Sequence, residues 1–482
     1  MTFVGERFEE FAARSPDKTA LTCGACALTW QTLLAEIRTS EEILRRCTAR
    51  EGRVALCLSD PAALLVWFFA CARTARIAMV LDPDWPAGRL SDVLEATAPE
   101  LVIDASGPGT GHLARVDPSP ADKDRDLAPQ EGDLFYAGFT SGTTGLPKGY
   151  IRTHGSWLRS FALTDTEFRT SEAERVLLPG RLTHSLHLYG AVDGLCRGQS
   201  VVVAPKFDPR RLLEELKAAA GGAILYATPT QLHYFAEAAR RLGPAPTVRQ
   251  VLASGAKWRD GDRSAAANVF PKARLIEFYG ASETSFITVS LPEESPPDGS
   301  VGRAASGVEI AVGDPRAPAP ARTSGDVWVR SGLLFSDYIC GAAADTRWQD
   351  DWLTFGDRGY LDENGHLFLT GRSGRMIVTA GLNVYPEEVE AVLSEHEAVA
   401  IAVVIGFDDP VRGQRVEAAI QPTDASGISD VDLMRHCRSR LAAGKLPRRI
   451  HIMDALPLTG GGKPDIRAVT EALQAKEMGE TQ

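Results

Sequence analysis

The chain has 482 residues and a formal net charge of −11 at pH 7, with 44% of its residues hydrophobic and 24% charged. This length exceeds what one hydrophobic core usually serves, so two or more domains are expected, and the hydrophobic share excludes an intrinsically disordered chain. The negative net charge argues against nucleic acid or an anionic membrane as the main partner.

The amino terminus and the cysteines indicate the cellular compartment. Residues 1–10 show no charged-then-apolar signal pattern, and no apolar run approaches the length that spans a bilayer. The eight cysteines are scattered, and the Cys-x-x-Cys pair of Cys23 and Cys26 has no second pair at zinc spacing. We therefore expect a cytoplasmic protein without a membrane span, whose cysteines are reduced core residues.

Helical periods alternate with short apolar runs in the first half of the chain. A helix between two buried parallel strands is predicted twice, with strands over 54–58 and 78–81 around a helix over 62–72, and strands over 200–204 and 223–226 around a helix over 211–220. This alternation is typical of a doubly wound α/β fold, and its recurrence predicts more than one parallel sheet.

The second half of the chain has a different texture. Between 307 and 330, short β-type runs separated by a Pro/Ala/Gly-rich turn predict a small antiparallel or barrel-like subdomain. From residue 373 onward, a helix over 384–393 opened by Pro386 and a strand over 400–405 predict a small α+β unit. The polar, glycine-bearing stretch 371–375 has the composition of a hinge, which divides the chain into domains 1–372 and 373–482.

Residues 135–149, FYAGFTSGTTGLPKG, concentrate hydroxyls, glycines and one lysine behind a predicted strand over 134–136. This composition suits a polyphosphate, because glycines let backbone N–H groups approach phosphate oxygens while hydroxyls and a lysine add donors and charge. It is not a Walker A loop, since Pro147 precedes the lysine and Gly149 follows it. A flexible polar surface loop is the alternative. The candidate phosphate contacts are Thr140, Ser141, Gly142, Thr143, Thr144, Gly145 and Lys148.

Four later segments offer further ligand-binding groups. In 277–283, Tyr279 presents an aromatic face beside a glycine, and Ser282 with Glu283 presents hard oxygens suited to Mg²⁺. A strand end with a solvated glutamate is the alternative for this segment. In 354–360, Asp357 could accept both hydroxyls of a ribose, and an ordinary Asp-Arg-Gly turn is the alternative.

The other two segments lie toward the end of the chain. Residues 369–390 lead through glycines and a basic pair into the predicted second domain, and 456–464 hold a glycine-rich loop that ends at Lys463. A lysine that follows three glycines suits a catalytic group that must enter and leave a site.

In order and spacing, these five segments resemble the adenylate-forming superfamily of acyl- and aryl-CoA synthetases, nonribosomal adenylation domains and firefly-type luciferases, and most of all the stand-alone acyl-CoA synthetases. The resemblance covers nearly the whole chain, from 28–33 and 81–90 through 302–303 to Lys463. It implies a large N-terminal domain of two mostly parallel sheets with helices plus a β-barrel subdomain, and a small mobile α+β C-terminal domain. The active site would lie between the two domains.

The resemblance also implies roles for individual residues. The loop from Thr140 to Lys148 would hold the β- and γ-phosphates of ATP, and Glu283 would bind Mg²⁺. Tyr279 would pack on adenine opposite the turn of Ser254, Gly255 and Ala256, and the rest of the nucleotide site would consist of Gly280, Ser282 and the ribose contacts Asp357 and Arg372.

The implied reaction has two steps. A carboxylate would attack the α-phosphorus of ATP to give an acyl-adenylate and pyrophosphate, with Lys463 and Mg²⁺ countering the negative charge. The C-terminal domain would then rotate about its hinge, residues 379–383 would help to build a tunnel, and a thiol would displace AMP. Family members usually carry an acidic residue or a lysine at the hinge position that aligns with Gly374, so this chain departs from the family there.

The acid and the acceptor are predicted more coarsely. The segment 182–189 aligns with the stretch that lines the acyl pocket, where His184 is the predicted functional histidine, His187 its rival and a structural histidine the alternative. This segment offers no aspartate for an α-ammonium group, which favours a fatty, aryl or other simple carboxylic acid. Coenzyme A is the predicted acceptor; an acyl or aryl carrier protein acting in trans and a catalytically silent nucleotide-binding relative are the alternatives.

Overall fold

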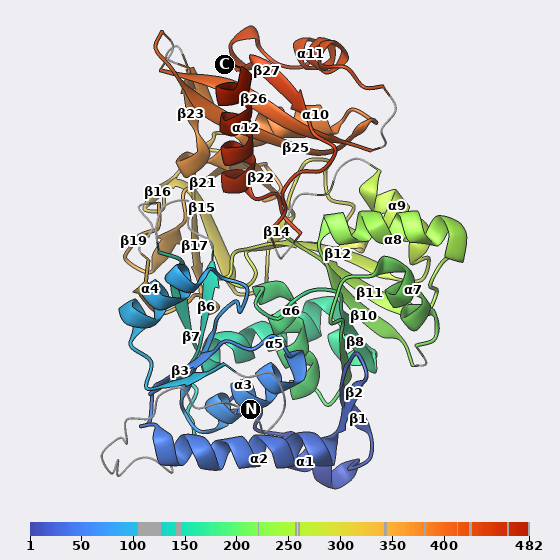
Figure 1. Cartoon of the computed structure of the whole chain (residues 1–482), viewed down its shortest axis with the longest axis vertical. Coiled ribbons are helices and arrows are strands. Elements are labelled where there is room, and N and C mark those ends of the chain that lie inside the picture. The colour runs from blue at the N-terminus through green and yellow to red at the C-terminus, as the bar shows by residue number, and fades with distance from the viewer. Residues whose placement is uncertain are drawn as a thin grey trace.

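The computed structural model has a large lower lobe and a smaller upper lobe formed by the last part of the chain (Figure 1). It describes residues 1–104, 127–140, 146–219, 221–255, 258, 261–341, 345–379, 382–411, 413–423, 427–459 and 462–480. Among these residues, no helix combines the length and the apolar character needed to cross a membrane.

The first sheet of the lower lobe has six strands in the order β18-β7-β6-β4-β3-β5, of which β6, β4, β3 and β5 run parallel. Its strands are β3 (Arg53–Leu56), β4 (Ile77–Val80), β5 (Leu101–Ile103), β6 (Leu134–Thr140), β7 (Lys148–Thr153) and β18 (Asp337–Cys340). Helices α2 (Trp30–Cys47), α3 (Pro61–Arg73), α4 (Ala87–Thr97) and α5 (His154–Phe168) accompany them. The start of α3 follows from its sequence, because the side chain of Asp60 accepts from Ala62 N and Pro61 fits the first turn.

The second sheet has nine strands in the order β14-β13-β12-β11-β10-β8-β9-β1-β2, and the six strands from β12 to β1 are parallel. They are β1 (Thr19–Cys23), β2 (Cys26–Thr29), β8 (Arg175–Leu178), β9 (Ser200–Val203), β10 (Ala223–Ala227), β11 (Val248–Ala253), β12 (Arg274–Tyr279), β13 (Thr288–Ser290) and β14 (Arg303–Ala304). The associated helices are α1 (Phe8–Arg14), α6 (Ser185–Cys196), α7 (Pro209–Lys217), α8 (Pro229–Leu242) and α9 (Asp262–Val269).

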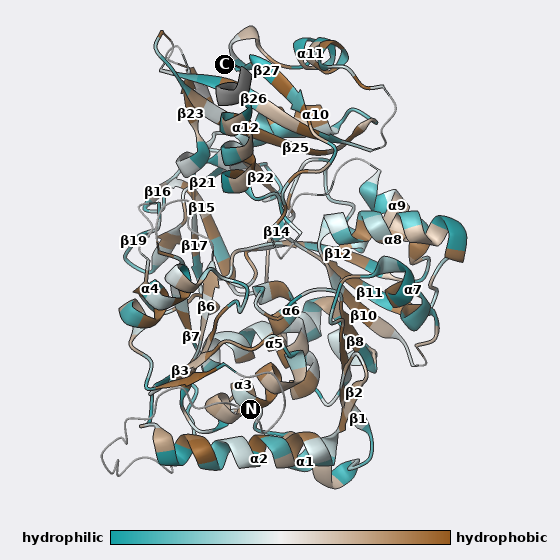
Figure 2. Ribbon diagram, viewed as in Figure 1, coloured by the Kyte–Doolittle hydropathy of each residue, from teal (hydrophilic) through white to brown (hydrophobic). Residues whose placement is uncertain are grey.

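Helices cover both faces of each large sheet. One core joins the two sheets through side chains of α3, α5 and α6, such as Phe68, Trp157 and Leu188. A second core lies under α7, α8 and α9 on the outer face of the nine-stranded sheet, and a third lies under α4. Figure 2 shows the brown, apolar strands enclosed by helices whose outer faces are teal. The predicted α/β fold of two mostly parallel sheets is confirmed.

A third sheet occupies the region for which a barrel-like subdomain was predicted. Its strands are β15 (Val308–Asp314), β16 (Ala317–Pro318), β17 (Gly325–Ser331), β19 (Arg347–Gln349), β20 (Trp352–Thr354), β21 (Asp357–Leu361) and β22 (Leu367–Arg372). All its pairings are antiparallel and they branch at β17, which pairs with β15, β20 and β21. Closure of these strands into a barrel stays a prediction.

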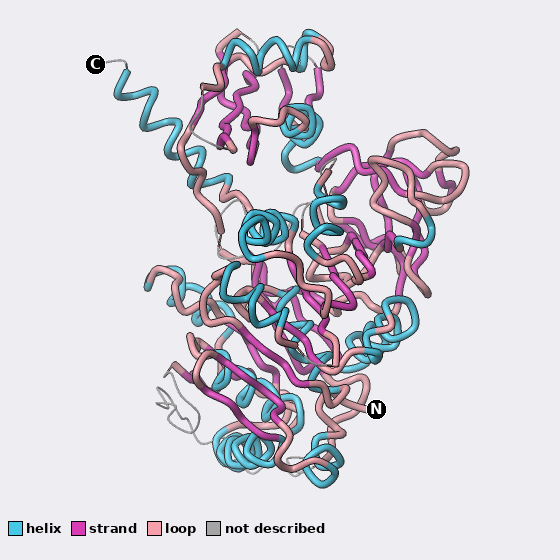
Figure 3. The backbone as a smooth tube through the Cα atoms, turned by 90° about the vertical axis from the view of Figure 1, so that its right-hand side faces the viewer, coloured by secondary structure: helices cyan, strands magenta, loops and turns pink. Residues whose placement is uncertain are grey.

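The upper lobe is a five-stranded α+β unit with its own core. It contains β23 (Ile377–Thr379), β24 (Leu382–Val384), α10 (Pro386–Ser394), β25 (Val399–Asp409), β26 (Gly413–Pro422), α11 (Asp430–Arg438), β27 (Arg449–Ile452) and α12 (Ile466–Glu480). Side chains of α10 and α11 fill one face of the sheet and those of α12 fill the other. Figure 3 shows this unit standing apart from the strands below it. The expected α+β character is present, although the domain boundary after residue 372 stays a prediction.

Candidate active site

The carboxyl ends of parallel strands bring several predicted site residues to one edge of the nine-stranded sheet. Ala227 of β10 is in register with Ala253 of β11, and Ala253 is in register with Glu277 of β12. The residues that follow these strands therefore emerge side by side, as ligand-binding groups of open α/β sheets do. They include Thr228, Gly255 and the segment from Tyr279 to Glu283.

Lys463 reaches this edge from the upper lobe. A Cβ added at Gly255 would lie 3.0 Å from Lys463 Cε and 3.5 Å from its Nζ, and Gly255 has a φ of +98°. A glycine is thus needed both for the backbone turn and for the room that the lysine occupies. Lys463 itself follows a tight turn, in which Thr459 N donates to Lys463 O at 2.7 Å. Residues 460–461 lie outside the described residues.

Lys463 is exposed to solvent and lies against Gly255 and near Arg372. Partial desolvation of the ammonium by the surrounding protein lowers the pKa of Lys463, and the positive charge of Arg372 lowers it further. Both effects disfavour the protonated form, so an incoming anion that offsets the two cations would be stabilised here. This is the electrostatic setting that a polyphosphate needs.

Tyr279, Asp357 and Arg372 form one hydrogen-bonded group. Asp357 opens β21 and is paired in register with Arg372 at the end of β22, so the hairpin itself sets the carboxylate against the guanidinium. The Tyr279 hydroxyl donates to Asp357 Oδ2 and Arg372 Nε donates to Oδ1. Burial and the nearby Asp357 raise the pKa of Tyr279, which keeps its hydroxyl protonated as a donor. Asp357 is 4% exposed, whereas the Arg372 side chain is 53% exposed and available to a ligand.

Glu283 lies in the turn after β12 with one carboxylate oxygen engaged. Tyr338 Oη donates to Glu283 Oε1 at 2.9 Å, and Phe335 N donates to the Glu283 carbonyl at 2.7 Å. Among the described residues no cluster of three or more metal-ligating side chains exists. A lone carboxylate fits Mg²⁺, which keeps several water or phosphate ligands, and does not fit an ion that needs an all-protein cage.

Arg152 fixes the segment that carries Glu283. This fully buried arginine on β7 donates from Nη1 to the Ser282 carbonyl at 2.9 Å, from Nη2 to Ser285 Oγ at 2.9 Å, and from Nη2 to the Leu333 carbonyl at 2.5 Å. Burial lowers the pKa of Arg152 to about 10, so the group stays protonated near neutral pH. The two backbone segments that meet at Glu283 are thereby tied to one guanidinium.

Strands β6 and β7 form a hairpin that carries the predicted phosphate loop. Thr140 is paired with Lys148 at its open end, so both flank the connection. The residues Ser141, Gly142, Thr143, Thr144 and Gly145 lie outside the described residues, and so does Ala256. Their predicted phosphate and adenine contacts stay predictions.

The two candidate histidines have different surroundings. His184 is half-buried and directly precedes α6, whereas His187 is 1% exposed and its ring packs so closely on Gly180 that no Cβ would fit there. Burial lowers the pKa of His187 to about 3, so it is neutral. Ser185 Oγ and Ser282 Oγ lie 2.8 Å apart, which links α6 to the Glu283 turn. His184 is therefore the better placed of the two for a ligand.

Gly374, the predicted hinge, lies in a short 3-10 turn over Ser373–Arg375 between the lobes. A Cβ at this position would overlap the carboxylate of Asp345, which comes from the lower lobe. A side chain at position 374 would therefore compete with the Asp345 carboxylate for the same space.

Three residues of this edge were not predicted from the sequence. Thr228 contributes its methyl group beside Gly255, Tyr338 binds Glu283, and Arg152 holds the turn. Arg152 follows buried residues of the same strand, and the sequence around it gives no local signal of its contacts. For Thr228, the capping sequence before Pro229 predicts a helix start, and such a start at a strand's carboxyl end is the signal that could have found it.

The sheet edge, the anion-binding setting and the lysine that reaches this edge from the upper lobe are together typical of an adenylate-forming enzyme. A family model described as AMP-binding enzyme matches residues 8–339, and one described as AMP-binding enzyme C-terminal domain matches residues 388–463. The chain belongs to this family, and it is an AMP-forming acid–thiol ligase of the acyl-CoA ligase type.

The chain is 32% identical over 478 residues to YhfT, an uncharacterized acyl-CoA ligase of Bacillus subtilis strain 168, covering 95% of this chain and 96% of that protein. It is 28% identical over 447 residues to the long-chain-fatty-acid–CoA ligase FadD13 of Mycobacterium tuberculosis, covering 86% and 87%. Its fold is similar to that of o-succinylbenzoate CoA synthetase (MenE) from Bacillus subtilis in complex with the acyl-adenylate intermediate, with a TM-score of 0.82, 23% identity and 97% of each chain covered. ATP-bound MatB from Rhodopseudomonas palustris gives a TM-score of 0.81 with 22% identity, covering 98% and 99%.

Proposed function

We propose that the protein activates a fatty or other simple carboxylic acid with ATP and Mg²⁺ and transfers the acyl group to coenzyme A. The observation that carries this proposal is the meeting of Lys463 with Gly255 at the sheet edge that also holds Tyr279 and Glu283. The names of the relatives, which include long-chain fatty acid–CoA ligases, support the acid and the acceptor.

In the first step, a carboxylate oxygen of the acid attacks the α-phosphorus of ATP, and the bond to the pyrophosphate oxygen breaks. The Lys463 ammonium counters the charge that gathers around phosphorus, and positioning of the two anions is the larger part of the catalysis. Asp357 and Arg372 would orient the ribose, and Tyr279 the adenine. Mg²⁺ bound by Glu283 would supply charge neutralisation at the phosphates.

In the second step, the sulfur of the thiol attacks the acyl carbonyl carbon and the bond to AMP breaks. Lys463 has no task in this step, so rotation of residues 373–482 about Gly374 can withdraw it. The cytoplasmic location stays a prediction. Loading of a separate carrier protein is the alternative to coenzyme A as the acceptor.

The test is a panel of acids that spans chain lengths and aryl acids, assayed for pyrophosphate release with and without coenzyme A. We expect adenylation of at least one fatty or simple acid and a coenzyme A-dependent thioester product. Thioester formation only on a carrier protein would replace the acceptor, and no pyrophosphate with any acid despite ATP binding would favour the silent relative.

A further inference from the structure

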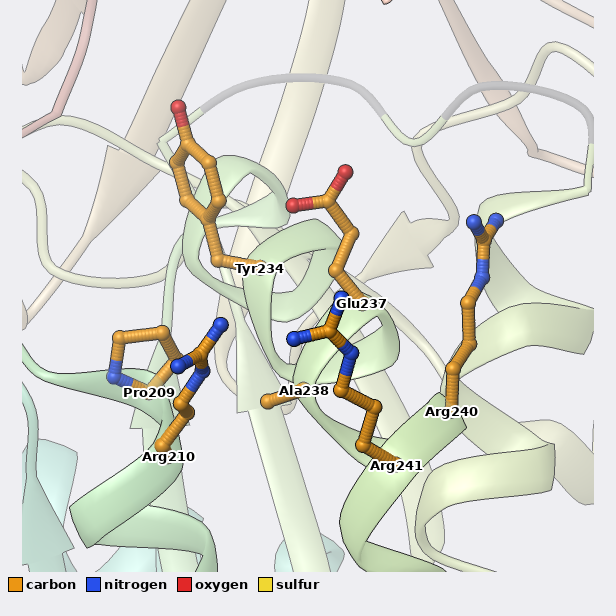
Figure 4. A pocket seen from close by; sticks show the side chains of 7 residues that line it. All are labelled: Pro209, Arg210, Tyr234, Glu237, Ala238, Arg240 and Arg241. Carbon is orange, nitrogen blue, oxygen red and sulfur yellow. The ribbon is translucent and has the colours of Figure 1, made fainter.

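A basic pocket lies on the outer face of the lower lobe, between α7 and α8. It has a volume of about 360 Å³, and α7 contributes Arg210 while α8 contributes Tyr234, Glu237, Arg240 and Arg241. In Figure 4 the three guanidinium groups, the Tyr234 hydroxyl and the Glu237 carboxylate all project toward the same side of these helices. The pocket is separate from the residues assigned to ATP and the acid.

The charges of this pocket are not balanced by the described part of the chain. Within the described residues, the side chains of Arg210, Arg240 and Arg241 make no hydrogen bond or ion pair, although the neighbouring Arg211 pairs with Glu215 at 3.2 Å. Glu237 Oε1 lies 3.5 Å from His233 Nε2, so the acid also faces this histidine. Three cations and one acid therefore leave a local positive excess on a chain whose net charge is −11.

The chemistry of the lining points to a phosphorylated ligand. A guanidinium presents donors in a planar fork that matches phosphate oxygens, and three of them around one concave site favour a group with more than one negative charge. Tyr234 adds an aromatic face, whose ring lies 6.1 Å from that of Phe207, and such a face can pack against a base. A phosphorylated nucleoside combines these two features.

The pocket lies at a suitable distance from the chemistry. Helix α8 begins directly after Thr228, which lies beside Gly255 and Lys463, and Arg240 is about twelve residues further along. At 1.5 Å per residue these twelve residues span about 18 Å. A phosphopantetheine arm has about thirteen bonds between sulfur and phosphorus, which at the reach of an extended chain amounts to about 15 Å. The rest of the diphosphate and the 3′-phosphate of coenzyme A lie beyond the end of this arm, so these phosphates can reach a site about 18 Å from the thiol.

We propose that Arg210, Arg240 and Arg241 bind the phosphate groups at the nucleotide end of coenzyme A, while its thiol reaches the acyl-adenylate near Thr228. This inference rests on the function proposed above, because it names the site that holds the nucleotide of the same acceptor. The pocket would then contribute to the second step and not to the first.

The test compares the wild type with the double variant Arg240→Gln/Arg241→Gln. Coenzyme A and pantetheine, which carries the same thiol without any phosphate, are the acceptors, and ionic strength is held constant. We expect KM for coenzyme A to rise at least tenfold in the variant, KM for pantetheine to stay within twofold, and acid-dependent ATP–pyrophosphate exchange to be unchanged. Unchanged exchange also shows that the variant is folded.

The matched control is Arg38→Gln/Arg46→Gln on α2, which removes the same charge from two exposed arginines in weak pairs of 3.5 and 3.9 Å at the far end of the lobe. It should leave both KM values as they are. An equal rise in KM for coenzyme A in the control, an equal rise for pantetheine in the pocket variant, or no rise at all would overturn the assignment.

A second readout uses adenosine 3′,5′-bisphosphate, a fragment of the nucleotide end. It should compete with coenzyme A in the wild type and lose this effect at least tenfold in the pocket variant; equal inhibition of both would contradict the proposal. Failure of the proposed function looks different, since the wild type would then form no acyl-CoA while exchange persists. Thioester formation on a carrier protein, weakened by the same variant, would assign the pocket to a protein partner and overturn it as a coenzyme A site.

Discussion

Lys463 touches the lower lobe at a glycine, and this contact makes its role testable residue by residue. Lys463→Ala removes one preorganised cation, which should slow acyl-adenylate formation about 10²- to 10³-fold. Thioester formation from a supplied acyl-adenylate should change by no more than a few-fold, because the lysine serves only the first step. The two rates are measured separately, by pyrophosphate release and by acyl-CoA formation. Equal losses in both would contradict the domain rotation.

The protonation of Lys463 predicts a pH dependence of its own. Its pKa is lowered by partial desolvation and by Arg372, so the ammonium loses its proton at a lower pH than an ordinary lysine. Adenylation should therefore fall as pH rises through this lowered pKa, with the full rate on the acidic side. Lys463→Arg keeps its charge at every accessible pH, so the basic limb of its pyrophosphate-exchange profile should disappear even if its rate is lower. A basic limb shared by both proteins would assign it to another group.

Arg152 offers a test of how the proposed Mg²⁺-binding turn at Glu283 is held. Arg152→Met would leave the carbonyls of Ser282 and Leu333 buried without their donor, which should cost about 2–4 kcal/mol of unfolding free energy. It should also raise the Mg²⁺ concentration needed for half-maximal exchange, because Glu283 follows Ser282 directly. Urea unfolding and a Mg²⁺ titration measure the two effects.

The control for this prediction is Arg159→Met, which removes an exposed arginine paired with Glu131. It should change stability by less than about 1 kcal/mol and leave the Mg²⁺ titration as it is. Arg152→Lys retains the positive charge without the planar guanidinium. Its loss of stability and its Mg²⁺ requirement should lie between those of Arg152→Met and Arg159→Met. An Arg152→Met protein that is less stable but titrates normally with Mg²⁺ would limit this arginine to a structural role.

At the scale of elements, the predicted hinge turn over Ser373–Arg375 offers a test of the domain arrangement. The Asp345 carboxylate of the lower lobe lies where a Cβ of residue 374 would be. A methyl group at this position would therefore clash with the lower lobe when Lys463 lies against Gly255. Gly374→Ala should therefore slow adenylation, by about 5- to 150-fold for an overpacking cost of about 1–3 kcal/mol. Asp345→Ala removes the obstacle, and the double variant should recover most of the rate.

A double-mutant cycle on pyrophosphate exchange measures this coupling. Additive losses would show that Asp345 and Gly374 act independently, and an unaffected Gly374→Ala would place the pivot elsewhere. Thioester formation from supplied adenylate serves as the reference, since it needs the other arrangement of the domains.

The elements that could be predicted from the sequence are those whose local pattern and burial agree. The predicted strand over 54–58 and helix over 62–72 correspond to β3 and α3, because both are apolar on every side and bounded by polar or proline residues. The helix predicted over 211–220 begins earlier, at Pro209, where Asp208 caps it. The strand predicted over 400–405 is longer in the structure, where β25 spans Val399–Asp409, and its last residues were missed because they contain a glycine and two aspartates, which are uncommon in strands.

The residues of the candidate site also divide into those that the sequence could predict and those that it could not. Tyr279, Asp357, Arg372 and Lys463 stand in segments whose composition is unusual enough to be singled out, and the fold brings them together. Contacts such as that of Tyr338 with Glu283 depend on β18 pairing with β7, which joins segments about 190 residues apart. No periodicity or composition of either segment encodes such a pairing.

At the scale of the whole molecule, the two lobes have separate cores, and the tryptophans separate them experimentally. All eight tryptophans precede residue 353, whereas the cores of the upper lobe begin at Ile377. Tryptophan fluorescence therefore reports on unfolding of the lower lobe alone. This allows the pH dependence of that lobe to be read without the contribution of the upper lobe.

Two buried neutral histidines should make the lower lobe less stable as the pH falls. His154 Nδ1 accepts from Val4 N at 3.1 Å and its ring stacks on Phe135 at 4.5 Å, and burial lowers the pKa of His154 to about 3 and that of His187 to about 3. An unfolded histidine has a pKa near 6.5, so the unfolded state binds more protons below this pH and stability falls as pH drops from about 7.5 toward 3. At pH 5.5 each of these two histidines should lower the free energy of unfolding by about 1.4 kcal/mol. Asp193 acts in the opposite direction, because burial raises its pKa to about 6.

Comparison of variants isolates one histidine from these opposing terms. His154→Gln keeps an acceptor for Val4 N and cannot be protonated, so its loss of stability between pH 7.5 and pH 5.5 should be smaller than that of the wild type by about 1.4 kcal/mol. Urea unfolding followed by tryptophan fluorescence at both pH values measures this. A His154→Gln protein with the same pH-dependent loss as the wild type would mean that His154 is protonated in the folded lobe as readily as in the unfolded chain, contrary to its burial.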